Sequence, residues 1–164
     1  MDSTSAYHGS CLCNAITFCI EGPIKAVTHC HCSQCRKAHG AAFASYGSVP
    51  GTQLKVSDTQ GAIRVFESSP GVSRSFCSTC GATLFWRKAT GDYADWVSVA
   101  LGTLDTPFVP GRQKHVHVQS GLCWLDWPAP TGVGADLSAM DDKVVPTPSD
   151  RGRYAPHRGG PASR

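Results

Sequence analysis

The segment from Thr28 to Gly40 constrains this chain more than any other stretch of its sequence. It reads THCHCSQCRKAHG and combines a C-x-C-x2-C motif with flanking histidines and two basic residues: Cys30, Cys32, Cys35, His29, His31, His39, Arg36 and Lys37. Buried structural cysteines usually occur singly on apolar faces, whereas cysteines at short fixed offsets hold a metal or carry out redox chemistry. The segment therefore predicts a metal site. We expect it on a loop, because both sulfurs of C-x-C must reach one ion.

The remaining cysteines form two pairs and two isolated residues. The pairs are Cys11 with Cys13 and Cys77 with Cys80, and Cys19 and Cys123 stand alone. The total of 9 is odd, and the N-terminal sequence has no basic region followed by an apolar run. Reduced thiols in a cytoplasmic protein fit this pattern better than disulfides in a secreted one. We expect Cys19 to be a packed side chain on a strand.

Seven clustered cysteines divide most simply into a group of four and a group of three. The four residues of the two pairs can form a closed tetrahedral zinc site with a structural role: Cys11, Cys13, Cys77 and Cys80. The trio Cys30, Cys32 and Cys35 lacks a fourth ligand. Either His29, His31 or His39 closes it as a second structural site, or the position stays open to water or substrate, as catalytic zinc requires.

The charge of an open three-thiolate zinc site decides its chemistry. Thiolate ligands reduce the Lewis acidity of zinc, so hydroxide formation is disfavoured and exchange of a sulfur ligand is favoured. The trio is therefore predicted to be catalytic and to hold a substrate thiolate. Arg36 and Lys37 could bind carboxylates of that substrate, or they are two solvated charges. His31 could move a proton, although a side chain pointing away from the metal is the simpler interpretation.

The rest of the sequence predicts one mainly β domain. We expect a frayed segment over residues 1–8, a zinc-binding domain over 9–128, and an irregular Pro- and Gly-rich tail over 129–164. A short helical turn is expected at 38–42, and strands are expected at 15–20, 43–49, 53–57, 62–68, 82–87, 96–101 and 115–119. Alternation at 15–20 places Ile16, Phe18 and Ile20 on one face. No stretch has the length of a membrane span.

Four stretches resemble the glutathione-dependent formaldehyde-activating enzyme family, which shares its domain with centromere protein V. They are GSCLC from Gly9, CHCSQCRKAHGAAF from Cys30, SSPGVSRSFCSTCGATLF from Ser68, and LGTLD from Leu101, with His115 and Trp124 downstream. The resemblance covers residues 7–128. It implies a β-tent fold of several small antiparallel sheets with zinc knuckles. Asn14 replaces a common glycine, and we expect it to adopt the positive φ that the turn requires.

The resemblance also implies a division of the metal sites and a reaction. It implies a structural zinc at the two cysteine pairs and a labile catalytic zinc at the trio. The implied activity is that of a carbon–sulfur lyase that joins formaldehyde to its co-substrate glutathione. Arg74 and Phe76, in RSFC, match the family pattern; both are interpreted as framework, with Arg74 a weaker site candidate.

Two other functions are compatible with the sequence. One is a non-catalytic zinc scaffold for a macromolecule, suggested by the basic tail residues Arg151, Arg153, Arg158 and Arg164, although a solvated, disordered tail is the simpler interpretation of that segment. The other is a redox role in which Cys30 and Cys35 form a disulfide on metal loss. The formal charge of +3 suggests no dedicated nucleic-acid surface, and we expect no membrane partner. The sequence leaves a homo-oligomer open.

Overall fold

The computed structural model describes residues 6–125, and its fold is mainly β, as the sequence predicts. The expected tail at 129–164, with its arginines, lies outside the described residues. The strands are β1 (Ala6–Ser10), β2 (Thr17–Glu21), β3 (Ala26–Cys30), β4 (Ala44–Pro50), β5 (Leu54–Ser57), β6 (Ile63–Ser69), β7 (Val72–Cys77), β8 (Thr83–Lys88), β9 (Trp96–Ala100) and β10 (Gln113–Val116). One α-helix, α1 (Ser33–His39), and three 3-10 turns, η1 (Gly51–Gln53), η2 (Leu101–Thr103) and η3 (Val118–Ser120), complete the described elements.

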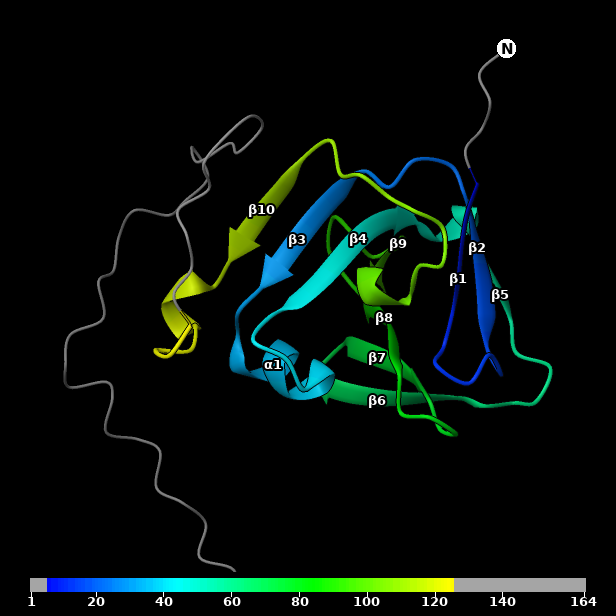
Figure 1. Cartoon of the computed structure of the whole chain (residues 1–164), viewed down its shortest axis with the longest axis horizontal. Helices are drawn as coiled ribbons and strands as arrows, with labels where there is room; N and C mark the ends of the chain where they lie inside the picture. The colour runs from blue at the N-terminus through cyan, green and yellow to red at the C-terminus, as the bar shows by residue number, and fades with distance from the viewer. Residues whose placement is uncertain (1–5, 126–164) are drawn as a thin grey trace, which may run out of the picture.

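The strands form two sheets. The 3-stranded sheet has the order β1-β2-β5, and the 7-stranded sheet has the order β10-β3-β4-β9-β8-β7-β6. Figure 1 shows the large sheet curving, so that β10, β3 and β4 lie side by side in the upper part of the view while β6 and β7 lie lower, to the right of α1. The β10–β3 pair is parallel, which makes the large sheet mixed rather than purely antiparallel. This pairing arises because the chain leaves β9 and returns through residues 101–112 to the edge beside β3.

The main core fills the space between the two sheets. Ile16, Phe18 and Ile20 are all buried there, as their alternation predicts, although β2 itself begins only at Thr17. The ring of Phe18 meets that of Phe85 on β8 edge to face, with centroids 5.4 Å apart. Aromatic pairs of this kind stabilise a contact beyond the area that they bury. The two sheets are therefore packed through side chains of β2 and β8.

The segment predicted as a loop is instead a strand followed by a helix. Cys30 ends β3, and Cys35 lies in the first turn of α1. Cys32 caps the helix, because its Sγ accepts a hydrogen bond from the Cys35 amide at 3.4 Å. Gly40 ends the helix in the left-handed region at φ 58°. The short turn expected at 38–42 is wrong in position, since the helix begins at Ser33.

The N-terminal boundary also differs from the expectation. Residues 6–8 belong to β1, which pairs with β2 from Ala6↔Glu21 to Ser10↔Thr17. The prediction of a frayed segment over 1–8 is therefore wrong for these three residues. Ladder hydrogen bonds order them despite their polar sequence, and residues 1–5 lie outside the described part of the chain.

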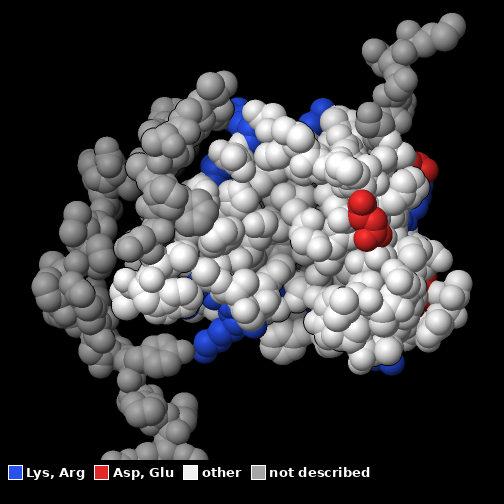
Figure 2. Space-filling view, viewed as in Figure 1, with Lys and Arg blue, Asp and Glu red and all other residues white. Residues whose placement is uncertain are grey.

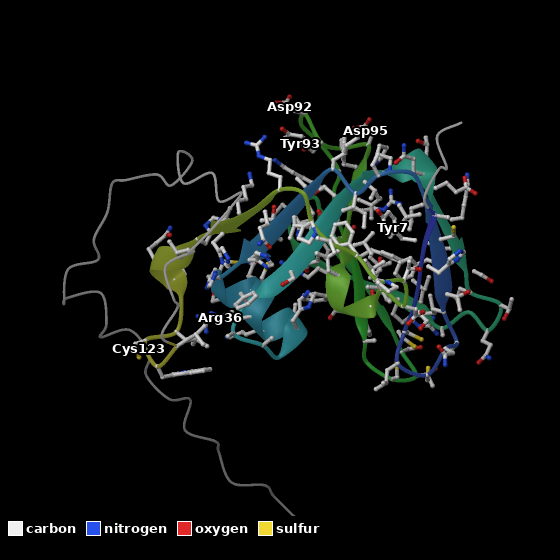
Figure 3. The ribbon with its side chains drawn as sticks, turned by 45° about the horizontal axis from the view of Figure 1, so that its top comes forward. Tyr7, Arg36, Asp92, Tyr93, Asp95 and Cys123 are labelled. Atoms are coloured by element: carbon white, nitrogen blue, oxygen red, sulfur yellow. The ribbon has the colours of Figure 1, made fainter. Side chains whose placement is uncertain are left out.

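The surface of the described domain carries few distinctive features. No helix within residues 6–125 has the length and apolar character needed to cross a membrane. Lysines and arginines occur in separate groups on the face drawn in Figure 2 and do not form one continuous patch. Asp92, Tyr93 and Asp95 lie in the turn before β9, far from α1 (Figure 3).

Replacing Gly9 by alanine should destabilise the domain. A Cβ at this position would collide with the ring of Phe18 and lie 2.5 Å from the Thr103 carbonyl oxygen. Overpacking of this kind costs about 1–3 kcal/mol. Thermal denaturation should show a lower Tm for G9A. The matched control is G102A, because no atom lies within 4 Å of a Cβ at Gly102; equal Tm values for both variants would contradict the packing argument.

Candidate metal centres

The two cysteine pairs meet where the two sheets meet. Cys11 and Cys13 lie in the turn between β1 and β2, whereas Cys77 ends β7 and Cys80 lies in the turn between β7 and β8. Their four Sγ atoms all lie within 4.8 Å of one another. The group, called the four-cysteine cluster below, could hold a metal ion and joins the small sheet to the large one.

The spacing of these sulfurs suits a tetrahedral zinc ion. Cys11 Sγ lies 3.6 Å from Cys13 Sγ, which lies 3.8 Å from Cys77 Sγ. A zinc ion with bonds of ~2.3 Å to four sulfurs would separate them by about 3.8 Å. Cys11 and Cys77 are buried, whereas Cys13 is exposed and Cys80 is half-buried. The residues present therefore fit a closed structural site at the edge of the core.

Backbone amides point at the sulfurs of this cluster. The Ile16 amide donates to Cys11 Sγ at 3.3 Å, and a hydrogen bond from the Ala82 amide is the main cause that lowers the pKa of Cys80 to about 6. Asn14 adopts φ 60° after the first pair and Gly81 adopts φ 76° after the second. The expected positive φ of Asn14 is confirmed. These turns aim amides at thiolates, which metal sites require around their ligands.

Cys30, Cys32 and Cys35 form a second group at the junction of β3 and α1. Their Sγ atoms also lie within 4.8 Å of one another, and Cys30 and Cys35 are buried. Within residues 6–125, no fourth Cys, His, Asp or Glu joins this trio. It could hold a metal ion through three protein sulfurs and leave one position for another ligand.

A buried arginine from β7 reaches the trio. Arg74 Nη2 donates to Cys35 Sγ at 3.6 Å, and Nη1 donates to the Tyr46 hydroxyl at 3.2 Å. Only 6% of Arg74 and 5% of Tyr46 are exposed. The hydrogen bond shared with Cys30, followed by the Arg74 guanidinium, lowers the pKa of Cys35 from its ordinary value. The same bond to Cys35 is the main cause that raises the pKa of Cys30. The trio is thus already set to carry negative charge on Cys35.

The trio opens into a cavity of about 300 Å³. Besides the cysteines, its walls combine aromatic, aliphatic and hydroxyl side chains with Arg74: Thr28, Tyr46, Ser69, Val72, Trp86, Ser98, Val116 and His117 among them. The sequence analysis missed Tyr46, Trp86 and Ser98, because they come from strands that only the fold brings next to Cys30. Binding sites of this kind combine apolar walls with a few polar groups.

Two larger hollows, of about 510 and 420 Å³, lie elsewhere. The first is lined by Val27, His29 and Ser45, which alternate along β3 and β4 with the residues that line the trio cavity. It therefore lies on the opposite face of the same sheet. We favour the smaller cavity as the functional one, because three thiols and a buried guanidinium converge on it.

The histidines near the trio have other partners. His29 Nδ1 pairs with Ser45 Oγ at 2.9 Å, and His31 Nε2 pairs with His115 Nδ1 at 2.9 Å. His39 Nε2 lies 2.7 Å from the Tyr46 hydroxyl. None of the three belongs to the trio's group of ligand atoms among the described residues. His31 does not line the trio cavity, and a side chain that points away from the metal stays a prediction.

The other residues singled out by the sequence lie outside both groups. Arg36 and Lys37 are on α1, and neither lines the trio cavity. Arg36 Nε donates to the His31 carbonyl at 3.1 Å, and Figure 3 shows the residue on the side of α1 that faces Cys123. Cys19 is half-buried and Cys123 is exposed. Their predicted roles stay predictions.

The fold and the two groups define a mainly β protein with two cysteine groups that could each hold a metal ion. The chain belongs to the glutathione-dependent formaldehyde-activating enzyme family, whose profile matches residues 6–120. An uncharacterized lyase of Schizosaccharomyces pombe is 31% identical over 87 residues, which cover 52% of this chain and 60% of that protein. A Colletotrichum graminicola protein named for glutathione-dependent formaldehyde activation is 31% identical over 58 residues, or 35% of this chain and 30% of that one. The chain thus spans less than two thirds of either relative.

A solved structure has the same fold. The crystal structure of a Rhodobacter sphaeroides protein superposes with a TM-score of 0.52 over 62% of this chain and 90% of that chain. The identity is 20%, so the similarity supports the fold and carries no statement about activity.

Substitutions of single ligands should separate the roles of the two groups. C77S should abolish cooperative folding, because a structural zinc binds with about 10–16 kcal/mol and a domain is stable by only about 5–15 kcal/mol. C35S should fold and contain less zinc. Circular dichroism and elemental analysis test both, with C123S as the control. A folded C77S protein with unchanged zinc would contradict the structural role.

The stacked histidines should make the domain less stable in acid. Burial, followed by the nearby His29 and His31, lowers the pKa of His115 from 6.5 to about 4. Between these pH values the unfolded state binds a proton at His115 that the folded state does not, so stability falls as the pH falls. Urea denaturation is measured from pH 7 to 5 at constant metal content. The free energy of unfolding should fall less steeply with falling pH for H115Q than for the wild type. Equal slopes would contradict this assignment.

Proposed function

We propose that this protein is a zinc-dependent carbon–sulfur lyase that joins formaldehyde to glutathione or a related thiol. The observation that carries the proposal is the trio. Its three thiols converge on a cavity of about 300 Å³, and no fourth protein ligand joins them within residues 6–125. Catalytic zinc sites keep such a position for water or substrate, whereas structural sites fill it with a protein ligand.

The ligand type favours thiol chemistry over hydrolysis. Cys30, Cys32 and Cys35 would hold the ion. When bound, zinc with three thiolate ligands would stabilise the ionised form of a substrate thiol, whose free pKa is ~8.5, and would be a weak source of hydroxide. Membership of the family also favours thiol chemistry, since the name of the family describes formaldehyde activation with glutathione.

The proposed reaction is an addition without net oxidation or reduction. The sulfur electron pair attacks the carbonyl carbon of formaldehyde and forms the C–S bond. The π pair of the carbonyl moves to its oxygen, which gains one proton in place of the proton lost by the thiol. The product is the S-hydroxymethyl adduct of the thiol, a hemithioacetal. The reverse reaction breaks the C–S bond and is a carbon–sulfur lyase reaction.

The residues around the trio suit this chemistry. Trp86, Val72 and Val116 contribute apolar walls that restrict water around the reacting atoms. The Tyr46 hydroxyl stays protonated, because burial, followed by the nearby charge of Cys35, raises its pKa. Arg36 and Lys37 are proposed to bind the substrate carboxylates outside the cavity.

Purified protein with zinc in both groups should accelerate the formation of S-hydroxymethylglutathione. Exchange between ¹³C-labelled formaldehyde and its glutathione adduct can be followed by NMR at equilibrium, where the spontaneous rate is measured alongside. C35S should return the exchange to the spontaneous rate, because the trio loses a ligand. C123S, altered at an exposed cysteine outside both groups, should match the wild type.

An exchange rate equal to the spontaneous one, with the trio shown to contain zinc, would overturn the assignment for this pair of substrates. Acceleration that survives in C35S would place the chemistry away from the trio.

A further inference from the structure

Arg74 is a buried cation, and among the described residues its one contact that can be anionic is a sulfur of the trio. Its Nε donates to Ser68 Oγ at 3.0 Å, Nη1 donates to the Tyr46 hydroxyl at 3.2 Å, and Nη2 donates to Cys35 Sγ at 3.6 Å. The first two acceptors are neutral. The contacts that residues 6–125 make to this guanidinium include no carboxylate, and only 6% of the residue is exposed.

Burying a positive charge costs free energy unless a negative charge lies close to it. An arginine cannot become neutral by losing its proton in a protein. A buried charge needs a paired opposite charge as well as hydrogen bonds. Ser68 and Tyr46 satisfy hydrogen bonds only, so the charge of Arg74 is balanced by the thiolates of the trio.

The sulfurs of the four-cysteine cluster are surrounded by different groups. Backbone amides such as that of Ile16 donate to its sulfurs, and Cys13 is exposed to water. The trio has two of its three cysteines buried and a side-chain cation placed against one of them. Within residues 6–125, a side-chain cation therefore donates a hydrogen bond to the trio and none does so to the four-cysteine cluster.

The net charge at the trio depends on which ligand fills the open position. Three thiolates and a divalent ion carry one net negative charge, which the guanidinium cancels. A substrate thiolate in the open position would add a further negative charge inside a partly buried cavity, which is unfavourable without a cation nearby. A neutral ligand in the same position would add none.

We propose that Arg74 is a positioning residue that acts through Cys35 to make the open position of the trio selective for an anionic sulfur over a neutral ligand. The proposal rests on the proposed function, since it requires a metal ion with an open position at the trio. It assigns to Arg74 a role in choosing the ligand, beyond its packing between β7 and β4.

Ligand titrations with cobalt in the trio and zinc in the four-cysteine cluster test this role. The visible spectrum of cobalt reports each ligand that enters its coordination sphere. The titrants are 2-mercaptoethanol, which binds as a thiolate and has no carboxylate, and imidazole, which binds neutral. Variants are R74Q, which removes the charge, R74K, which keeps it, and R87Q, an exposed arginine on β8 as the control.

The wild type and R87Q should bind both ligands. R74Q should weaken thiol binding by about ten- to a thousandfold, the effect of one opposite charge at this range, and leave imidazole binding unchanged. R74K should recover most of the thiol affinity. If R74Q does not fold, R74K still tests the proposal, because a folded R74K protein with no preference for the thiol would overturn it.

The remaining outcomes separate this inference from the proposed function. Equal weakening of thiol and imidazole in R74Q would assign Arg74 a packing role and overturn the inference, while the open site would stand. A wild-type cobalt spectrum that neither ligand changes would show a closed site, and would overturn the inference and the proposed function together.

Discussion

The approach of two cysteine turns is the contact on which the rest of this domain depends. The turn after β1 and the turn after β7 belong to different sheets, and their sulfurs meet within 4.8 Å. The small sheet buries its apolar side chains against the larger sheet, where Phe18 packs on Phe85, so its docking depends on this packing and on the cysteine contact. The larger sheet in turn supplies every strand that borders the trio. The cluster proposed to hold a structural metal thus supports the strands that border the proposed catalytic site.

Local sequence determined what could be predicted. Both cysteine groups are built from pairs at offsets of two or three residues, which bring sulfurs together through a single turn whatever the surrounding fold. The alternation of Ile16, Phe18 and Ile20 reports burial in the same local way, and all three are buried. The positive φ of Asn14 follows from its place after a cysteine pair.

Long-range pairing determined what could not be predicted. The cavity walls come from strands far apart in the chain, and the register Val116↔Cys30 places one of them beside the trio. The helix at Ser33 depends on a cysteine as its cap, an unusual choice that masks its start in the sequence. Arg74 was only a weaker candidate, because its importance comes from burial without a carboxylate, which the motif RSFC cannot reveal.

The two cysteine pairs of the four-cysteine cluster are also synthesised at different times. Cys13 and Cys77 are 64 residues apart, so at a synthesis rate of ~5–20 residues per second the first pair waits about 3–13 seconds for the second. During this interval the trio has emerged, while β10, which borders it, has not. A nascent chain therefore presents six thiols before Cys77 is made, five of which belong to the first pair and the trio. Their proposed role as metal ligands requires that these five stay reduced until the chain is complete.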